Sequence, residues 1–238
     1  MKYGLPYKEV IFNTKAQVIV NKVISYRHRW TRGQIVSGTK SNRSSEIAWL
    51  GDRELLAMLL RMIKKINEDD YELYRPHLPH KYGKTSLKRL ARDLDSKIEE
   101  LVGSEIEIDI VGFSMGGLIS RFWLQNYDGF LRTKRFFSIG TPHFGTYTAQ
   151  MIPSFLMPGI AEMKRGSSLL SQLNNDLTSL KKVQCTSFFT KWDLMSFPGW
   201  QAKLSVGDSY HLPVLTHKEL ITNSRSLDIL AKKIFNCS

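Results

Sequence analysis

Residues 109–120 read DIVGFSMGGLIS, an apolar strand-like run that gives way to a helix-forming run at a single serine. Gly112 and Gly116 flank Ser114 in the pattern G-x-S-x-G, in which the serine occupies a sharp strand-to-helix turn that small neighbours make sterically possible. Such a turn lifts the hydroxyl clear of the sheet, and the start of the helix directs backbone N–H groups, above all that of Met115, toward a developing oxyanion. The stretch predicts a nucleophilic serine rather than the alternative, a glycine-rich packing turn.

Strand-like and helix-like segments alternate on both sides of this stretch, from about residue 46 onward. This alternation predicts an α/β fold with a mostly parallel sheet flanked by helices. Thr85 or Ser86 is the expected cap of one helix, and Pro213 favours an edge position for the last strand. We expect strands at 71–74, 105–111, 135–140, 184–190 and 210–215, and helices at 53–66, 85–102, 115–127 and 226–235.

The length of 238 residues suits a single domain of this class, and the sequence shows no repeat or linker that would divide it. We therefore expect one domain over residues 1–238. Residues 151–182 interrupt the alternation, which predicts either a cap over a binding cleft or a packed helical excursion. Residues 1–50 form a divergent N-terminal segment.

The composition, 42% hydrophobic and 24% charged, is that of a globular protein and excludes disordered and collagen-like classes. The formal net charge of +12 indicates a basic solvated surface, with weak attraction to an anionic membrane surface as the alternative. The basic residues are scattered, so we expect no nucleic-acid partner. The sequence has neither an apolar run of about 18 residues nor a leader-like start, and a cytoplasmic location is expected.

The two cysteines, Cys185 and Cys237, are too few for a disulfide framework and are expected to be free thiols in a reducing compartment. His77 and His80 lack a third ligand at useful spacing and are more typical of a loop than of a metal site. The segment YGKTS, residues 82–86, lacks the earlier glycine of a phosphate-binding loop. We expect no metal and no cofactor.

A serine nucleophile needs a base, usually a histidine that a carboxylate orients, and in this fold the chain order is serine, acid, histidine. This order excludes the three histidines that precede Ser114. Of those that follow, His143 lies one strand beyond the serine and is expected to shape a turn, and His211 lies inside a strand. His217, in the loop after the last strand, is the predicted base.

The acid is expected where a strand ends, because a side chain there reaches the same edge of the sheet as the serine. Asp193 directly follows the apolar run 184–190 and is our prediction. Asp176, within a polar helix-like stretch, and Asp208, in a Gly-Asp-Ser turn, are the alternatives. The predicted catalytic triad is Ser114, Asp193 and His217.

These motifs support a family resemblance. The segments IDIVGFSMGGLISRFWLQ, FFSIGTPHFGT, WDLMSFP and LPVLTHKELITNSRSL occur in the order and spacing of bacterial triacylglycerol-lipase-like proteins of the α/β-hydrolase superfamily, which the chain resembles from about residue 71 to its end. The resemblance implies the α/β-hydrolase fold and hydrolysis of carboxylic esters with acyl chains. It also implies the roles of nucleophile, acid and base for Ser114, Asp193 and His217.

The chain departs from this family where the second oxyanion-hole donor is expected. Family members carry an apolar strand that ends in His-Gly near the N-terminus, and this sequence contains no His-Gly. Two places could substitute: Gly38 and Thr39 after a short strand, or Gly51 and Asp52. We favour Thr39, because the second place leaves little loop before the helix expected at 53–66; alternatively, residues 11–50 have diverged and no longer build the hole.

The predicted function is therefore that of a lipase or esterase acting on an ester or lipid substrate. The same triad supports a thioesterase or an acyltransferase, and the missing His-Gly supports a catalytically weakened hydrolase-like binding protein. Apolar residues that could line an acyl pocket, or belong to the core, are Phe113, Phe144, Phe155, Met157 and Trp192.

Overall fold

The structure is a computed structural model that describes residues 45–50, 71–74, 76, 78–80 and 83–235. The predicted helix 53–66, Thr39 and most of the divergent segment 1–50 lie outside these ranges. The prediction of one domain over the whole chain therefore stays a prediction.

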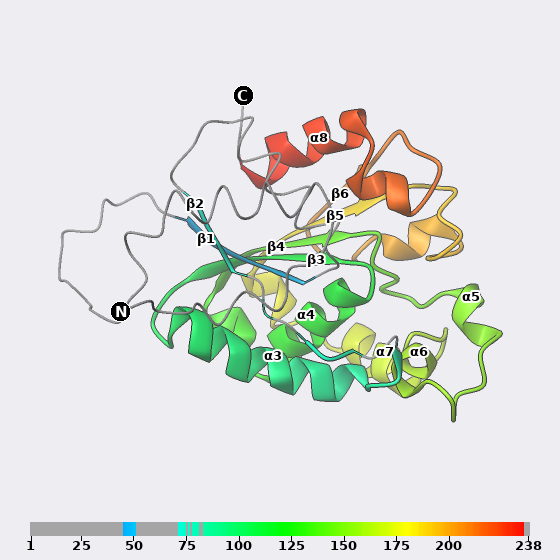
Figure 1. The fold of residues 1–238 in the computed structure, drawn as a ribbon, viewed down its shortest axis with the longest axis horizontal. Helices are drawn as coiled ribbons and strands as arrows, with labels where there is room; N and C mark the ends of the chain where they lie inside the picture. Colours follow the sequence, from blue (N-terminus) through cyan, green and yellow to red (C-terminus); the bar gives the residue numbers. More distant parts are fainter. Residues whose placement is uncertain (1–44, 51–70, 75, 77, 81–82, 236–238) are drawn as a thin grey trace, which may run out of the picture. The chain divides into compact units, whose positions relative to one another are not determined.

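Six described strands form one sheet in the order β2-β1-β3-β4-β5-β6, and every neighbouring pair is parallel (Figure 1). The predicted α/β fold with a mostly parallel sheet is confirmed. The strands are β1 (Ser45–Leu50), β2 (Tyr71–Tyr74), β3 (Ile108–Phe113), β4 (Thr133–Ile139), β5 (Gln184–Phe189) and β6 (Asp208–His211).

The last strand lies at an edge of the described sheet, as Pro213 predicted, but it ends earlier than expected. The predicted range 210–215 is wrong beyond His211. Leu212 N still donates to Phe189 O at 2.8 Å, whereas the next residue is proline, which has no N–H to continue the pairing. The chain then turns, since Val214 N bonds back to Leu212 O at 2.8 Å.

Helices cover both faces of the sheet. Helix α3 (Leu87–Val102) begins at Ser86, whose side chain accepts the N–H of Arg89, so one of the two predicted caps is confirmed. In Figure 1, α3, α4 and α7 lie on one side of the sheet and α8 lies on the other. The other α-helices in the described residues are α4 (Met115–Asn126), α5 (Tyr147–Gln150), α6 (Pro158–Glu162), α7 (Ser168–Asn175) and α8 (Ser224–Ile234).

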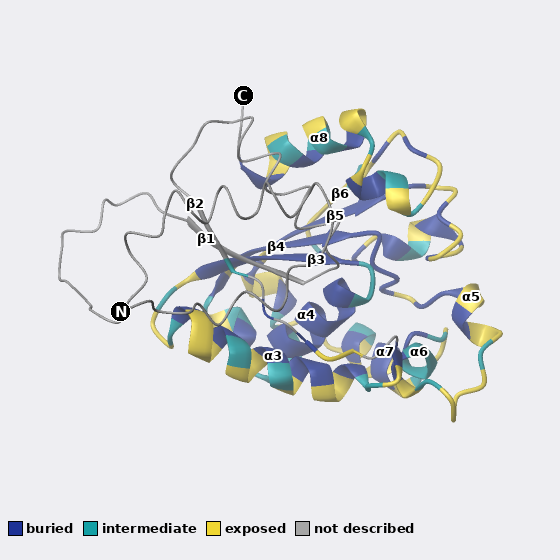
Figure 2. Ribbon diagram, viewed as in Figure 1, coloured by how far each residue is buried: buried dark blue, intermediate teal, exposed yellow. Residues whose placement is uncertain are grey.

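The two faces bury separate apolar clusters, shown as the dark inner surfaces of the helices in Figure 2. Ile110 and Phe136 point to the α3 side, whereas their chain neighbours Val111 and Phe137 point to the α8 side. This alternation along β3 and β4 is what a strand buried on both faces requires. Packing on both faces holds the strands in register, and their ends with them.

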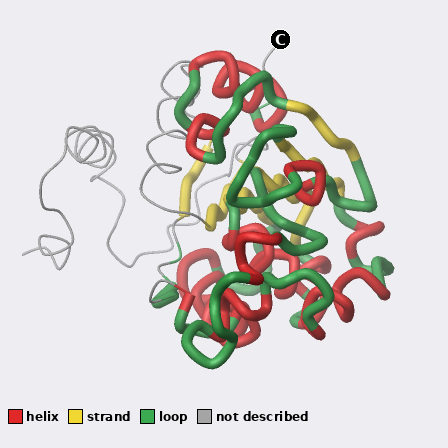
Figure 3. The backbone as a smooth tube through the Cα atoms, turned by 90° about the vertical axis from the view of Figure 1, so that its right-hand side faces the viewer, coloured by secondary structure: helices red, strands yellow, loops and turns green. Residues whose placement is uncertain are grey.

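The parallel register brings the carboxyl ends of the strands to one edge, which Figure 3 faces. Leu50 pairs with Gly112, Gly112 with Ser138, and Ser138 with Ser187. In open α/β sheets this edge is where ligands bind, because the loops that follow the strands meet there. The segment 151–182 contributes α6, α7 and the 3₁₀ turn Leu180–Lys182. Leu169, Leu170 and Leu173 of α7 are buried in the core, and the role of the segment as a cap stays a prediction.

Candidate active site

Ser114 lies in the single-residue turn between β3 and α4. Its backbone angles, φ 52° and ψ −123°, place it in a region that residues other than glycine rarely occupy. The turn is held because Ser114 N donates to Ile139 O at 2.9 Å and Gly117 N donates to Ser114 O at 3.1 Å. Strain of this kind is characteristic of functional sites, where surrounding packing maintains it. The side chain remains partly accessible to solvent.

Two glycines let the strand and the helix approach this closely. A Cβ on Gly112 would lie 2.5 Å from Gly117 Cα, and a Cβ on Gly117 would lie 2.0 Å from Thr141 Oγ1. Both distances are too short for a real side chain. Gly112 is one of the two glycines of the G-x-S-x-G pattern. Gly117, the other glycine of this close approach, directly follows the second glycine of the pattern, Gly116.

The structure brings Asp193 and His217 together, although 24 positions separate them in the chain. His217 Nδ1 lies 2.6 Å from Asp193 Oδ2. Asp193 is fully buried, and its other oxygen, Oδ1, accepts the backbone N–H groups of Met195 at 2.8 Å and Ser196 at 3.1 Å. The carboxylate is thus held rigidly, with one oxygen free to orient the imidazole.

His217 is also placed next to the serine turn. Its ring packs on Phe113, the residue before Ser114, with the ring centroids 4.7 Å apart. It lies over Gly140, where an added Cβ would approach Cε1 to 3.0 Å and Nδ1 to 3.2 Å. Within the described part of the chain, no hydrogen bond to Ser114 Oγ or to His217 Nε2 is formed. A hydrogen bond between a nucleophile and its base often tightens only when substrate binds.

Sequence reasoning missed one residue of this arrangement, Ser196. Its backbone N–H binds Asp193, and its hydroxyl donates to Gly140 O at 2.7 Å, so it ties the acid-bearing loop to the end of β4. The signal in the sequence was the three-residue spacing of Asp193 and Ser196. An aspartate side chain often accepts the N–H groups of the residues two and three positions later in a local turn, and serine is common in such turns.

The alternative acids and bases lie elsewhere. Asp208 begins β6, at the amino end of the strands and therefore at the opposite edge from Ser114. Asp176 is exposed after α7, where it accepts the N–H of Thr178 at 2.9 Å. His211 ends β6, with its ring packed edge-on against Phe189. None of the three bonds to the pair Asp193–His217.

His143 shapes the loop after β4, as expected. It is completely buried, and Nε2 lies 3.0 Å from Ser138 Oγ. Desolvation, with a further contribution from the nearby Arg121 guanidinium, holds the pKa of His143 well below its usual value of 6.5. The imidazole is therefore neutral at ordinary pH and belongs to the packing beneath the site.

Arg121 braces the same loop from α4. Its guanidinium donates to Leu173 O at 2.8 Å, to Asn174 Oδ1 at 2.9 Å and to His143 O at 3.4 Å. Burial lowers the pKa of Arg121 to about 10. A cation at the C-terminal end of α7 is favourable to the helix dipole, so this side chain joins α4, α7 and the His143 loop.

Met115, the first of the two predicted oxyanion-hole donors, directly follows Ser114. Met115 is the first residue of α4, and the helix itself offers no acceptor for its N–H. Thr39, the predicted second donor, lies outside the described residues, as do Gly51 and Asp52. The register pairs Leu50 with Gly112, so the chain leaves β1 beside the strand residue two positions before Ser114.

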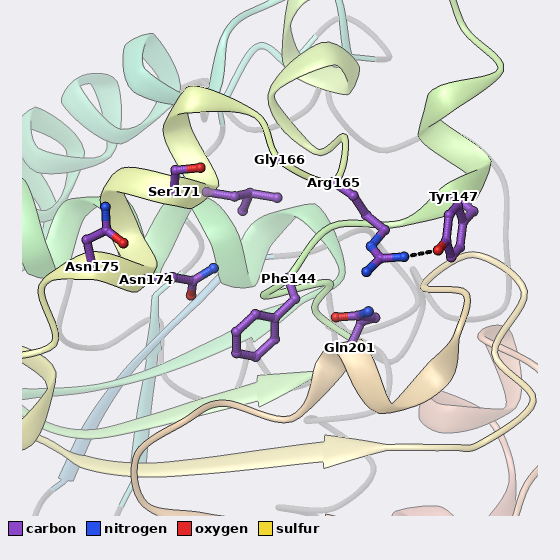
Figure 4. Close-up of a pocket in the computed structure, with 9 residues that line it drawn as sticks. Phe144, Tyr147, Arg165, Gly166, Ser171, Asn174, Asn175 and Gln201 are labelled. Carbon is purple, nitrogen blue, oxygen red and sulfur yellow. Dashed lines mark hydrogen bonds between the residues drawn. The ribbon is translucent and has the colours of Figure 1, made fainter.

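A pocket of about 570 Å³ opens between the loop after β4, α7 and the turn at Gln201 (Figure 4). Arg165 and Tyr147 stand at one side of it, where the guanidinium also lies 4.5 Å from the centre of the tyrosine ring. Asn174 and Gln201 add amide groups. Of the residues predicted for an acyl pocket, Phe144 lines this pocket. Phe113 does not, because it is buried against His217. The other three, Phe155, Met157 and Trp192, do not line it either.

Among the described residues, no group of three side chains has the composition of a metal site, and no helix is long and apolar enough to cross a bilayer. Cys185 is a buried free thiol, and burial raises its pKa to about 12. Cys237 lies outside the described residues.

The sequence matches no protein-family model and no curated protein, but solved structures do match. Lipase B of Aspergillus fumigatus superposes with a TM-score of 0.67 at 15% identity, and the mature form of a Bacillus licheniformis lipase with 0.62 at 14%. The chain has the α/β-hydrolase fold. A metagenomic carboxyl esterase shares this α/β-hydrolase fold with a TM-score of 0.60 at 12% identity.

The extent of the match differs among these structures. The match covers 81% of this chain but 52% of the Aspergillus lipase, so the chain spans about half the length of that protein. It covers 85% of this chain and 96% of the Bacillus lipase, and 85% and 78% for the esterase. The predicted resemblance to lipases and esterases of the α/β-hydrolase fold is confirmed at the level of the fold.

Proposed function

We propose that the protein is a serine hydrolase that cleaves carboxylic esters of acyl chains through an acyl-enzyme. The observation that carries this proposal is the 2.6 Å contact between His217 and the buried Asp193, with the imidazole packed on the residue before Ser114. A strained serine turn, a histidine and a carboxylate at one sheet edge are the groups that acyl transfer requires.

The proposed mechanism assigns a separate task to each of these groups. Asp193 Oδ2 accepts a hydrogen bond from the Nδ1–H of His217, which leaves Nε2 as the base that removes the proton of Ser114 Oγ. Oγ bonds to the ester carbonyl carbon, and the N–H of Met115 stabilises the oxyanion. His217 then gives its proton to the departing alcohol, and a water molecule, activated in the same way, releases the acid.

The second oxyanion donor is proposed to come from Gly51 or Asp52 rather than from Thr39. The pairing of Leu50 with Gly112 supports this choice, because β1 ends at Leu50, beside the strand residue two positions before Ser114. Loss of one such donor typically lowers the rate about 10²–10³-fold, so a shifted hole is compatible with slower but measurable turnover.

The test is hydrolysis of p-nitrophenyl esters of graded chain length by the wild type and by Ser114→Ala. We expect turnover that disappears in the variant, and labelling of the wild type alone by a fluorophosphonate. Equal rates for both proteins would refute the proposal, and a folded wild type that fails to label would favour a binding protein. Thioesters and added acceptor alcohols in the same panel distinguish ester hydrolysis from thioester hydrolysis and acyl transfer.

A further inference from the structure

Large apolar side chains are exposed next to the proposed site. Of the thirteen that are exposed in the described part of the chain, nine fall on two short segments. We call these nine the apolar rim. They are Tyr147, Met151, Phe155 and Leu156 on the first segment, and Trp192, Leu194, Met195, Phe197 and Trp200 on the second.

The two segments are joined directly by hydrogen bonds and a ring contact. Tyr147 N donates to Phe197 O at 3.1 Å, and Thr148 Oγ1 donates to Met195 O at 3.2 Å. The rings of Tyr147 and Phe197 lie 6.3 Å apart. These contacts hold the two segments that carry the exposed apolar side chains beside each other, and a cluster of exposed apolar residues is typical of an interaction surface.

The rim is built on the loop that carries the acid of the proposed triad. Trp192 and Leu194 are the chain neighbours of Asp193, and their exposed fractions are 67% and 69% although Asp193 is fully buried. The carboxylate binds the N–H of Met195, a third member of the rim. Whatever covers the rim consequently lies beside the site and contacts the loop that orients His217.

The charged side chains near the rim are mostly basic. Lys164, Arg165, Lys191 and Lys203 belong to the two stretches 144–165 and 191–203, whose only acids are Glu162 and Asp193. Asp193 is bound to His217, and Glu162 Oε2 caps the N–H of Leu87. None of the four cations forms an ion pair with another described residue.

Arg165 shows how these cations are held. Its guanidinium donates to the hydroxyl of Tyr147, a member of the rim, and both residues line the pocket in Figure 4. Because Tyr147 is uncharged, it does not neutralise the positive charge of Arg165, which can still attract an anion. Tryptophan and tyrosine rings flanked by cations are the combination that lies at the boundary between lipid headgroups and acyl chains.

From these observations we infer that the apolar rim docks onto an anionic lipid surface and presents the site to acyl esters within it. This inference deepens the proposed function, on which it rests, by assigning the physical state of the substrate. The formal net charge of +12 acts in the same direction, since each basic residue near an anionic bilayer strengthens attachment.

The experiment uses Ser114→Ala, so that binding is measured without hydrolysis. Cosedimentation with vesicles of phosphatidylglycerol and phosphatidylcholine is expected, with a blue shift of tryptophan emission. Adding Trp192→Ser and Trp200→Ser should weaken partitioning about tenfold or more, because both rings leave water on docking. The matched control is Leu131→Ser, which removes a side chain 74% exposed at the amino end of β4, far from the rim, and should change nothing.

The charge is tested separately. Arg165→Gln with Lys191→Gln should weaken binding to the anionic vesicles several-fold and leave the weaker binding to pure phosphatidylcholine unchanged. Arg92→Gln, on the exposed side of α3, is the control. Equal partitioning of the rim variants and the wild type would overturn the inference. So would a concentration-dependent dimer, lost in Trp192→Ser, in a protein that does not bind vesicles.

The failures of the two proposals can be told apart. Vesicle binding by Ser114→Ala without p-nitrophenyl ester turnover by the wild type would refute the proposed function alone. Turnover of soluble esters by a protein that ignores vesicles would refute the lipid surface alone.

Discussion

Ser114 has a strained backbone, because φ 52° with ψ −123° is a conformation that glycine adopts far more readily than serine. Ser114→Gly should therefore raise the free energy of unfolding by about 1 kcal/mol, the relieved strain being partly offset by the greater freedom of glycine in the unfolded chain. Ser114→Ala should leave stability nearly unchanged, and both variants should be inactive. Urea unfolding checks this; a Ser114→Gly protein less stable than Ser114→Ala would contradict it.

Asp193 has two separable tasks, one for each oxygen. In Asp193→Asn the amide oxygen still accepts the N–H groups of Met195 and Ser196, but the NH₂ group faces His217 Nδ1 and favours the wrong tautomer. We expect kcat to fall about 10³–10⁴-fold with the melting temperature little changed. Ester hydrolysis and thermal melts measure the two effects. Asp208→Asn, at the opposite edge of the sheet, should keep wild-type kcat, and a comparable loss there would contradict the assignment.

At the scale of elements, the contact between α4 and the loop after β4 positions Ser114. Gly117→Ala places a methyl group against Thr141, so α4 and the loop after β4 must move apart. We expect a loss of about 1–3 kcal/mol in the free energy of unfolding and a lower kcat, since Ser114 shares the displaced turn. The double variant with Thr141→Gly should lose less than the sum of the single changes. Additive losses in denaturant unfolding would show that the two residues are not coupled.

Elements were predictable to different degrees. The strand β3, the helix α4 and the Ser86 cap follow local patterns of apolar spacing and capping, and the sequence predicts them within a few residues. The end of β6 was missed, because the apolar run continues through Leu212 and Val214 while the backbone pairing has already stopped. Apolar side chains report burial, and these two are buried outside any strand.

For the whole molecule, the neutral buried His143 couples stability to pH. Its pKa in the folded chain is depressed below 6.5 by desolvation, so between these two values the unfolded chain binds a proton that the folded chain does not. The free energy of unfolding should therefore fall as pH drops below about 6.5, by up to about 1.4 kcal/mol per pH unit from this group. Urea unfolding from pH 7.5 to about 5 measures it. His143→Gln should flatten the slope relative to the wild type, and parallel slopes would contradict the prediction.

The sequence by itself determined the kinds of element, their order and the candidates for chemistry, because apolar periodicity, capping and the G-x-S-x-G turn are encoded within a few neighbouring residues. Only the tertiary structure decided that Asp193, and neither Asp176 nor Asp208, meets His217. It also decided that Ser196 and Phe113 hold that pair in place and that nine exposed apolar residues gather beside it. Those contacts join residues distant in the chain, and they depend on the order and register of the strands, which local patterns do not specify.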